Sequence, residues 1–259
     1  MKKKVTENCR SAFCFLLLTF FVTPLWAEDD TSTQLWGSFV FGHLTNEKLY
    51  FEVELQPKVQ VAGGEKWRNL DATWYVEYYP NRWLDLTGEL VTGFTDQNDD
   101  VSSFELTPKV GIRLHLIEEM FKTIRKDKVY LERITLNRLF LALWLRLENR
   151  HFYYFGEMDS SHDVRFRARP EVKFAINNSS LGHDKTLFLH TDVEFFFPVD
   201  SDIPERFANK IRTRLGFGYR FNANRKVEIL YVHDENRESP LDGFENEANC
   251  LDFRFTFLF

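Results

Sequence analysis

The chain has 259 residues, with 33 lysine or arginine and 39 aspartate or glutamate residues, which give a formal net charge of −6. This length suits one domain, and the acidic balance argues against a nucleic-acid partner. Although phenylalanine occurs 27 times, charged residues make up 28% of the chain and no long apolar run follows the N-terminal segment, which excludes a helical membrane protein.

Residues 1–27 have the features of a cleavable secretory signal peptide. Lysines occupy positions 2–4, an apolar run extends from 12 to 22, and Ala27 supplies a small residue at the expected cleavage site. As a membrane anchor the same run is short, because a helical span needs roughly 20 apolar residues. We therefore expect export of a mature chain, with residues 28–259 forming one outer-membrane β-barrel in a Gram-negative bacterium.

After this segment, apolar and polar residues alternate with a period of two, which is typical of β-strands with two different faces. The first predicted strands are at 34–43, 48–61, 68–79, 82–94 and 103–116. Each is long enough for a tilted membrane strand of roughly 9 to 11 residues. In such a strand the apolar face contacts lipid and the polar face lines the lumen of a barrel.

The segment 117–138 interrupts this pattern. Met120, Phe121 and Ile124 have helical spacing, which predicts a short helical connector near 117–127. Residues 129–137 have the composition of a further strand. The strand register around this segment is therefore open.

The alternation resumes at residue 139 and continues to the end of the sequence. Further predicted strands are at 139–153, 163–176, 186–197, 208–221, 226–233 and 248–259. Single-chain bacterial barrels usually have an even number of strands. We therefore expect an all-β, closed antiparallel transmembrane barrel of about twelve strands, with ten as the fallback.

Longer polar connectors separate some of these strands, at 95–102, 155–162, 198–207 and 234–248. We expect them to be external loops, because outer-membrane barrels join short turns at one rim to long loops at the other. The connector 234–248 is strongly acidic. A solvated loop is the simpler interpretation, and binding of divalent cations or a basic ligand is the alternative.

The last predicted strand favours a membrane barrel over a soluble β-protein. Its outward positions are Leu251, Phe253, Phe255, Phe257 and Phe259. Such a strand resembles the terminal strand by which bacterial outer-membrane barrels are recognised by their assembly machinery. We expect outer-membrane lipid and the barrel assembly machinery as partners, while the oligomeric state is left open. Closure of the sheet is expected because unpaired backbone groups are costly in hydrocarbon.

The alternation also places many charged side chains inside the predicted barrel. The candidate lumen residues are Glu52, Glu54, Glu77, Glu89, Arg146, Glu148, Arg150, Arg165, Arg167, Arg169, Glu171, Asp192, Glu194, Arg212 and Arg214. Acidic residues lean toward the first half of the chain and basic residues toward the second, which predicts two opposed charged walls. The simplest interpretation is a structural barrel whose lumen charges pair, because unpaired charges would be costly there. The alternative is a narrow pore whose transverse field selects small polar solutes.

An outer-membrane enzyme is a further alternative. A lipid hydrolase would need a serine beside a histidine on the outer wall, and Ser161 with His162 lies in a predicted loop without a visible orienting partner. A peptide hydrolase would need a histidine and acidic residues at the rim, and His233 beside Asp234 is the better candidate. Such short pairings arise often by chance, so we assign no catalytic residue.

No cofactor or metal site is expected. The seven histidines are scattered, and no paired zinc-ligand spacing occurs. Two of the three cysteines lie in the expected signal peptide, so Cys250 has no partner for an internal disulfide. Its role is left open.

Several motifs together resemble a known family. The run 144–174 contains Arg146-x-Glu148-x-Arg150 and then Arg165-x-Arg167. Further carriers of the resemblance are Gln34-Leu35-Trp36, Glu194-Phe195, Arg214-Leu215-Gly216-Phe217-Gly218 and Tyr231. They resemble the hallmark regions of a family of uncharacterised bacterial outer-membrane β-barrels known as a domain of unknown function. The resemblance implies a fold and a location, and it supplies no substrate or active site.

Overall fold

The structure is a computed structural model, and its regular elements are all β-strands. It describes residues 31–46, 48–63, 66–97, 102–117, 120–126, 128–134, 137–155, 159–199, 209–237 and 243–259. Within these ranges no helix is long and apolar enough to cross a membrane. The signal peptide expected over 1–27 lies outside the described residues.

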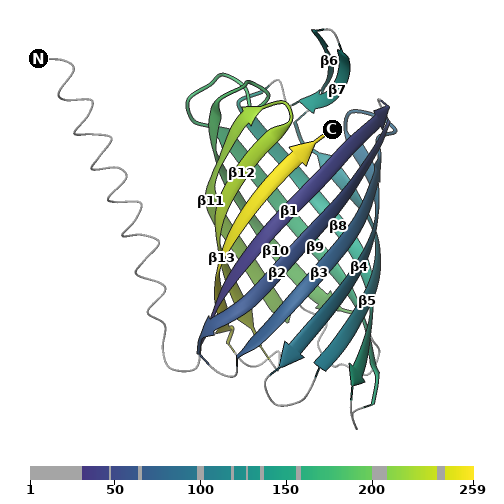
Figure 1. Ribbon diagram of the computed structural model, residues 1–259, viewed down its shortest axis with the longest axis vertical. Helices are drawn as coiled ribbons and strands as arrows, with labels where there is room; N and C mark the ends of the chain where they lie inside the picture. Colours follow the sequence, from purple (N-terminus) through teal and green to yellow (C-terminus); the bar gives the residue numbers. More distant parts are fainter. Residues whose placement is uncertain are drawn as a thin grey trace, which may run out of the picture.

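Eleven strands form one closed barrel, in which strands joined along the chain pair side by side (Figure 1). They are β1 (Ser32–Asn46), β2 (Leu49–Ala62), β3 (Trp67–Tyr78), β4 (Leu84–Gln97), β5 (Ser102–His115), β8 (Leu139–Phe155), β9 (Ser161–Ala175), β10 (Thr186–Pro198), β11 (Lys210–Asn222), β12 (Arg225–Asn236) and β13 (Glu245–Leu258). The expected all-β barrel of about twelve strands is confirmed, with a count between twelve and the fallback of ten.

The barrel closes through a parallel pair. β1 lies parallel to β13, with Leu35 opposite Leu251 and Phe41 opposite Phe257, whereas the other barrel pairs are antiparallel. A chain that runs up and down through an odd number of strands must close in this way. A parallel ladder still pairs the backbone groups of both edges, so closure does not require the even count that bacterial precedent suggests.

The two rims of the barrel differ. The turn rim holds the strand ends that flank 47–48, 79–83, 116–138, 176–185 and 223–224, together with the end of β13. The loop rim holds the start of β1 and the strand ends that flank 63–66, 98–101, 156–160, 199–209 and 237–244. The connectors expected to be external loops therefore all leave the barrel at one rim.

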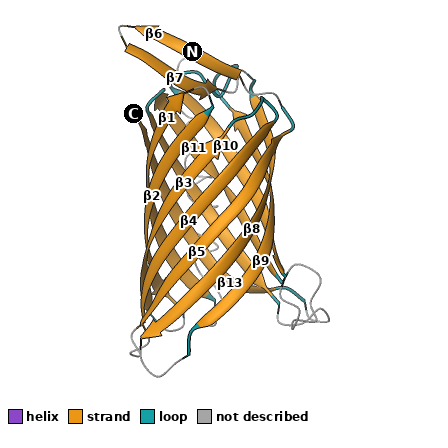
Figure 2. Ribbon diagram, turned by 90° about the vertical axis from the view of Figure 1, so that its right-hand side faces the viewer, coloured by secondary structure: helices purple, strands orange, loops and turns teal. Residues whose placement is uncertain are grey.

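The prediction of a helical connector near 117–127 is wrong. β6 (Met120–Lys126) and β7 (Lys128–Ile134) form a two-stranded antiparallel sheet that lies beyond the turn rim (Figure 2). Three apolar residues at helical spacing are a weak signal in a short segment, and the sequence here also contains β-branched residues that favour strands. The further strand considered for 129–137 corresponds to β7, but it pairs with β6 and does not enter the barrel.

The barrel is apolar outside and polar inside. Large hydrophobic side chains are exposed on the outward face, among them Leu35, Phe39, Phe51, Leu70, Trp74, Leu90, Phe94, Val110, Leu147, Leu215 and Ile229. Most of the fully buried residues are polar or charged, and they belong to the inward face. The arrangement inverts that of a soluble protein, whose buried residues are mainly apolar.

The parallel closure can be tested with disulfides on the outward face. In a variant without the native cysteines, Phe41→Cys and Phe257→Cys put two thiols at directly paired positions. Cα atoms so paired lie within the ~4.4–6.8 Å that a disulfide requires. We expect oxidation to join β1 to β13, detected as altered migration of the unfolded chain in electrophoresis.

The control combines Phe41→Cys with Phe253→Cys, which lies about 13 Å from the paired position along β13. It is expected to remain unlinked. Cross-linking of the control pair in preference to the test pair would show that the register is different.

Candidate functional site

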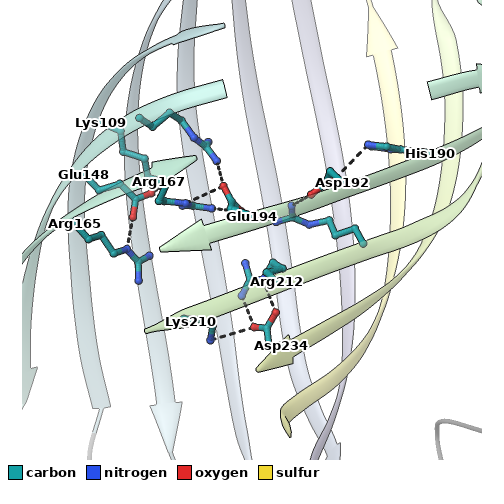
Figure 3. A network of polar contacts seen from close by, with 12 residues as sticks. Lys109, Glu148, Arg165, Arg167, His190, Asp192, Glu194, Lys210, Arg212 and Asp234 are labelled. Atoms are coloured by element: carbon teal, nitrogen blue, oxygen red, sulfur yellow. Dashed lines mark hydrogen bonds and ion pairs between the residues drawn. The ribbon is translucent and has the colours of Figure 1, made fainter. Parts of the chain in front are cut away.

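The inward faces of β8, β9 and β10 carry a dense cluster of charged side chains (Figure 3). Glu148 on β8 has no exposed surface and contacts Lys109 at 3.2 Å and Arg165 at 2.5 Å. It also accepts a hydrogen bond from Nη1 of Arg167. A carboxylate excluded from water is thus held by three cations, which offset the cost of burying its charge.

A second buried carboxylate lies beside the first. Glu194 on β10 has no exposed surface, and it accepts hydrogen bonds from Arg146 at 2.5 Å and from Arg167 at 2.9 Å. Arg214 approaches its other oxygen at 3.2 Å. Arg167 therefore bridges Glu148 and Glu194, and the two clusters form one network.

The network closes on itself through β4 and β5. Glu89 on β4 accepts a hydrogen bond from Arg146 at 3.0 Å and lies 3.5 Å from Lys109, which also contacts Glu148. We call this closed circuit the ion-pair ring, and its members are Glu89, Lys109, Arg146, Glu148, Arg167 and Glu194. It links five neighbouring strands by contacts that the backbone ladder does not supply.

Aromatic side chains fill the lumen beside the ring. Phe196 is 2% exposed, and the guanidinium groups of Arg165 and Arg167 lie 4.8 and 4.5 Å from its ring centre. Trp36 is 7% exposed, with the guanidinium of Arg212 at 5.2 Å. Cations over aromatic faces are stabilised by the ring quadrupole, so these side chains fill space and also hold charge.

Two further groups of ion pairs extend the network. Asp234 accepts two hydrogen bonds of 2.6 Å from Arg212, a bidentate pair that fixes both groups. His190 lies 2.9 Å from Glu228, 3.3 Å from Glu171 and 3.4 Å from Asp192. The imidazole therefore connects the inward faces of β9, β10 and β12.

These contacts exclude water from the two central carboxylates of the ring. A carboxylate in a water-filled channel would have exposed surface, yet Glu148 and Glu194 have none, and Arg146 and Arg167 are 7% and 6% exposed. Each buried carboxylate needs its cations, because an uncompensated buried charge costs several kcal/mol.

Toward the turn rim the lumen opens into a cavity of about 440 Å³. We call this cavity the chamber. Phe140, Trp144 and Phe188 give it an aromatic side, and Glu89 and Arg146 of the ion-pair ring lie at its inner end. The chamber thus lies at the turn rim and reaches inward to the ion-pair ring.

The structure brings most of the sequence-predicted lumen residues into these two regions. Glu52, Glu54 and Glu77 line the chamber. Arg150 lies nearer the loop rim and pairs with Glu105 at 3.0 Å. Arg169 lines the chamber, and among the described residues no carboxylate lies within 4.0 Å of it.

Some members of the network were missing from the sequence-based candidates. Lys109 and Arg113 have the inward parity of β5, so the alternation already marked them. Asp234 was assigned to a loop, because the sequence pattern ends β12 too early and the strand continues to Asn236. Parity alone gives no sign that His190 contacts three carboxylates.

The outward face carries a shallow apolar groove of about 740 Å³ between β1 and β4. Leu35, Phe39, Leu70, Phe94 and Phe253 line it. It lies close to the parallel pair, and Phe39 stacks on Phe255 of β13 with ring centres 5.6 Å apart. The outward residues of β13, which sequence analysis assigned to barrel assembly, thus pack against β1.

The rim candidate His233 lies on the outward face of β12. Its Nδ1 contacts Asn249 at 2.9 Å, and Tyr231 donates a hydrogen bond to the same Asn249 oxygen at 2.5 Å. Glu235 is 3.8 Å from its other nitrogen. Within the described residues no serine, threonine or cysteine is hydrogen-bonded to His233.

Ser161 and His162 lie in β9 and not in a loop, so the sequence-based placement was wrong there. As consecutive strand residues they point to opposite faces. Accordingly His162 contacts Asn149 on the outward face at 2.5 Å, while Ser161 contacts Tyr154 at 3.4 Å. They therefore cannot act as a nucleophile and base pair.

Cys250 is buried beside Trp36 and Val232 and is a free thiol. Among the described residues no group of three or more histidine, cysteine, aspartate or glutamate side chains has a geometry that could hold a metal ion.

The ion-pair ring predicts a large effect of a single isosteric change. Glu194→Gln removes the charge that faces three guanidinium groups, and we expect a loss of about 3–5 kcal/mol in the free energy of unfolding. The measurement is urea unfolding of the protein folded in lipid vesicles.

The matched control is Glu105→Gln, whose side chain is 24% exposed and pairs with Arg150. A partly exposed pair contributes about 1 kcal/mol or less, so this variant is expected to stay close to wild type. Equal, small effects of both substitutions would contradict the buried network.

Two comparisons with known proteins bear on the identity of the chain. Residues 33–244, from β1 to the connection before β13, match the family described as Protein of unknown function (DUF2490). A search of the curated proteins gives no match.

Proposed function

The chain belongs to the DUF2490 family, and we propose that it is an outer-membrane β-barrel whose closed lumen holds solutes in a chamber and does not pass them. The match confirms that the family which the sequence motifs resemble is one of unknown function, and the location in the outer membrane stays a proposal. Membership carries no substrate, so the proposal rests on the geometry of the barrel.

The outward face supports a location in lipid. Large apolar side chains are exposed around the barrel, from Leu35 and Phe39 on β1 through Phe94 on β4 to Leu215 and Ile229 on β11 and β12. Soluble monomers rarely expose contiguous apolar patches larger than a few hundred Å². A closed sheet also satisfies the backbone groups that hydrocarbon would leave unpaired.

The polar connectors 98–101, 156–160, 199–209 and 237–244 all lie at one rim and support an orientation, although the longest connection, 116–138, lies at the other. Outer-membrane barrels have short turns on the periplasmic side and longer loops outside. We infer that the turn rim, with the chamber mouth, faces the periplasm, while the loop rim faces the exterior.

The observation that carries the closed lumen is the complete burial of Glu148 and Glu194. An open pore would keep its charged lining in water, whereas these carboxylates are enclosed by arginines of neighbouring strands. Of the two functions that the sequence left open, the structural barrel with paired lumen charges is therefore favoured over a permanently open pore. The hydrolase alternative at His233 lacks a nucleophile among the described residues and is not proposed.

Planar-bilayer recordings test the closed lumen. We expect the purified, folded wild-type chain to give no discrete conductance steps. The variant Arg146→Ala, Glu148→Ala, Arg167→Ala, Glu194→Ala removes equal numbers of positive and negative charges from the ion-pair ring together with their bulk, and it is expected to conduct.

The control is Glu105→Ala with Arg150→Ala, which removes an ion pair outside the ring and is expected to stay silent. Folding of each variant is checked by the difference in electrophoretic migration between unheated and heated samples. Large conductance steps from the wild type itself would refute the closed lumen.

A further inference from the structure

The chamber at the turn rim is lined by charged side chains that are almost all paired. The pairs are Glu54 with Arg254 at 3.0 Å, Glu77 with Arg113 at 3.0 Å, Glu89 with Arg146 at 3.0 Å, Glu171 with Lys173 at 2.7 Å and Glu228 with Lys226 at 2.8 Å. Arg220 also has an interaction partner, and Arg225 is exposed at the mouth. Apart from these, two lining side-chain charges remain, one of each sign.

The acidic one is Glu52 on β2. It accepts a hydrogen bond of 2.5 Å from the Tyr50 hydroxyl, and no cation lies within 4.0 Å of it in the described part of the chain. The basic one is Arg169 on β9. Its guanidinium lies 4.5 Å from the centre of the Trp144 ring, and its Nε has no hydrogen-bond partner among the described residues.

These two charges lie on opposite walls. In the order of the closed sheet, β8, β5, β4 and β3 separate β9 from β2 on one side, and β10, β11, β12, β13 and β1 separate them on the other. An acidic and a basic group that lack ion-pair partners therefore face a common cavity from opposite directions, too far apart in the ring of strands to pair with each other.

A row of aromatic rings runs between them. Tyr50, which contacts Glu52, has its ring centre 6.3 Å from that of Tyr75, and Tyr75 is 6.4 Å from Trp144, over which Arg169 lies. The row extends across the chamber from the acid to the base, and at its Trp144 end the guanidinium of Arg113 also lies 3.4 Å from the ring centre.

We propose that the chamber binds a short peptide with free ends, its ammonium group at Glu52, its carboxylate at Arg169 and its side chains against the aromatic row. An arginine can hold a carboxylate through two parallel hydrogen bonds. An extended chain covers at most ~3.3–3.6 Å per residue, so about three to four residues span the successive distances of 6.3 and 6.4 Å between the ring centres. A simple anion would meet Arg169 but leave Glu52 without a counter-charge.

This inference deepens the proposed function and rests on it, because a bound peptide stays in the chamber only if the lumen is closed beyond it. Peptides of this size are products of proteolysis, so a peptide-bond hydrolysis must supply them. With the turn rim facing the periplasm, the chamber would take them from that side.

The test uses the purified full chain in detergent micelles and isothermal titration calorimetry with the tripeptide Ala-Phe-Ala. Two matched probes are its N-acetylated form, which lacks the ammonium charge, and its C-amidated form, which lacks the carboxylate charge. We expect each modification to weaken binding to the wild type by roughly 10- to 100-fold, the usual effect of losing one hydrogen bond to a charged group.

Variants assign each end of the peptide. Glu52→Gln is expected to weaken binding of the unmodified tripeptide. In this variant N-acetylation should have no further effect on binding, while C-amidation should still weaken it. Arg169→Gln is also expected to weaken binding of the unmodified tripeptide, but here C-amidation should have no further effect while N-acetylation should still weaken binding. Loss of additivity between a variant and the matching probe identifies a direct contact. The controls Glu105→Gln and Arg150→Gln, at a pair outside the chamber, should leave all affinities unchanged.

Several results would overturn the peptide site. These are no binding of the tripeptide to the wild type, equal binding of the free and modified peptides, or equal losses in the control variants. If only Arg169→Gln and C-amidation weaken binding, while Glu52→Gln and N-acetylation have no effect, the chamber holds a simple anion site instead. A barrel that stays silent in bilayers but binds no peptide would leave the proposed function standing and remove only this inference.

Discussion

The pairing of inward charges is the constraint on which the rest of this barrel depends. A strand with lipid on one side must place its polar residues on the other, and a narrow closed sheet leaves those residues little water. Glu148 and Glu194 can be charged there only because arginines of adjacent strands surround them. The same contacts that offset the cost of burial would also close the lumen, as the proposed function requires.

The network links strands that the backbone ladder does not join. Arg146 on β8 contacts Glu89 on β4 and Glu194 on β10. These two strands do not pair with β8, because β5 lies between β8 and β4, and β9 lies between β8 and β10. Such contacts stiffen the cross-section at the level of the ring. The chamber lies between this level and the turn rim, and Glu89 and Arg146 of the ring form its inner end.

Sequence alternation was enough to predict the strands and the inward position of the charged candidates, because period two is imposed by the strand itself. It could not give the parallel closure, since the pattern of Phe41 and Phe257 is the same whatever strand lies beside them. Helical spacing misled at Met120, where three residues carry little information. Which charges pair, and that Glu52 and Arg169 do not, depends on the order of strands around the ring and on side-chain reach, which no local pattern contains.

The most direct test of the account is the location and state of the mature chain in a Gram-negative host. After separation of periplasm, inner membrane and outer membrane, the chain should be found in the outer-membrane fraction. There it should resist extraction by urea and migrate faster unheated than heated, as a closed barrel does. Recovery of the processed chain freely dissolved in the periplasm would contradict the claim that its apolar outward face is covered by lipid.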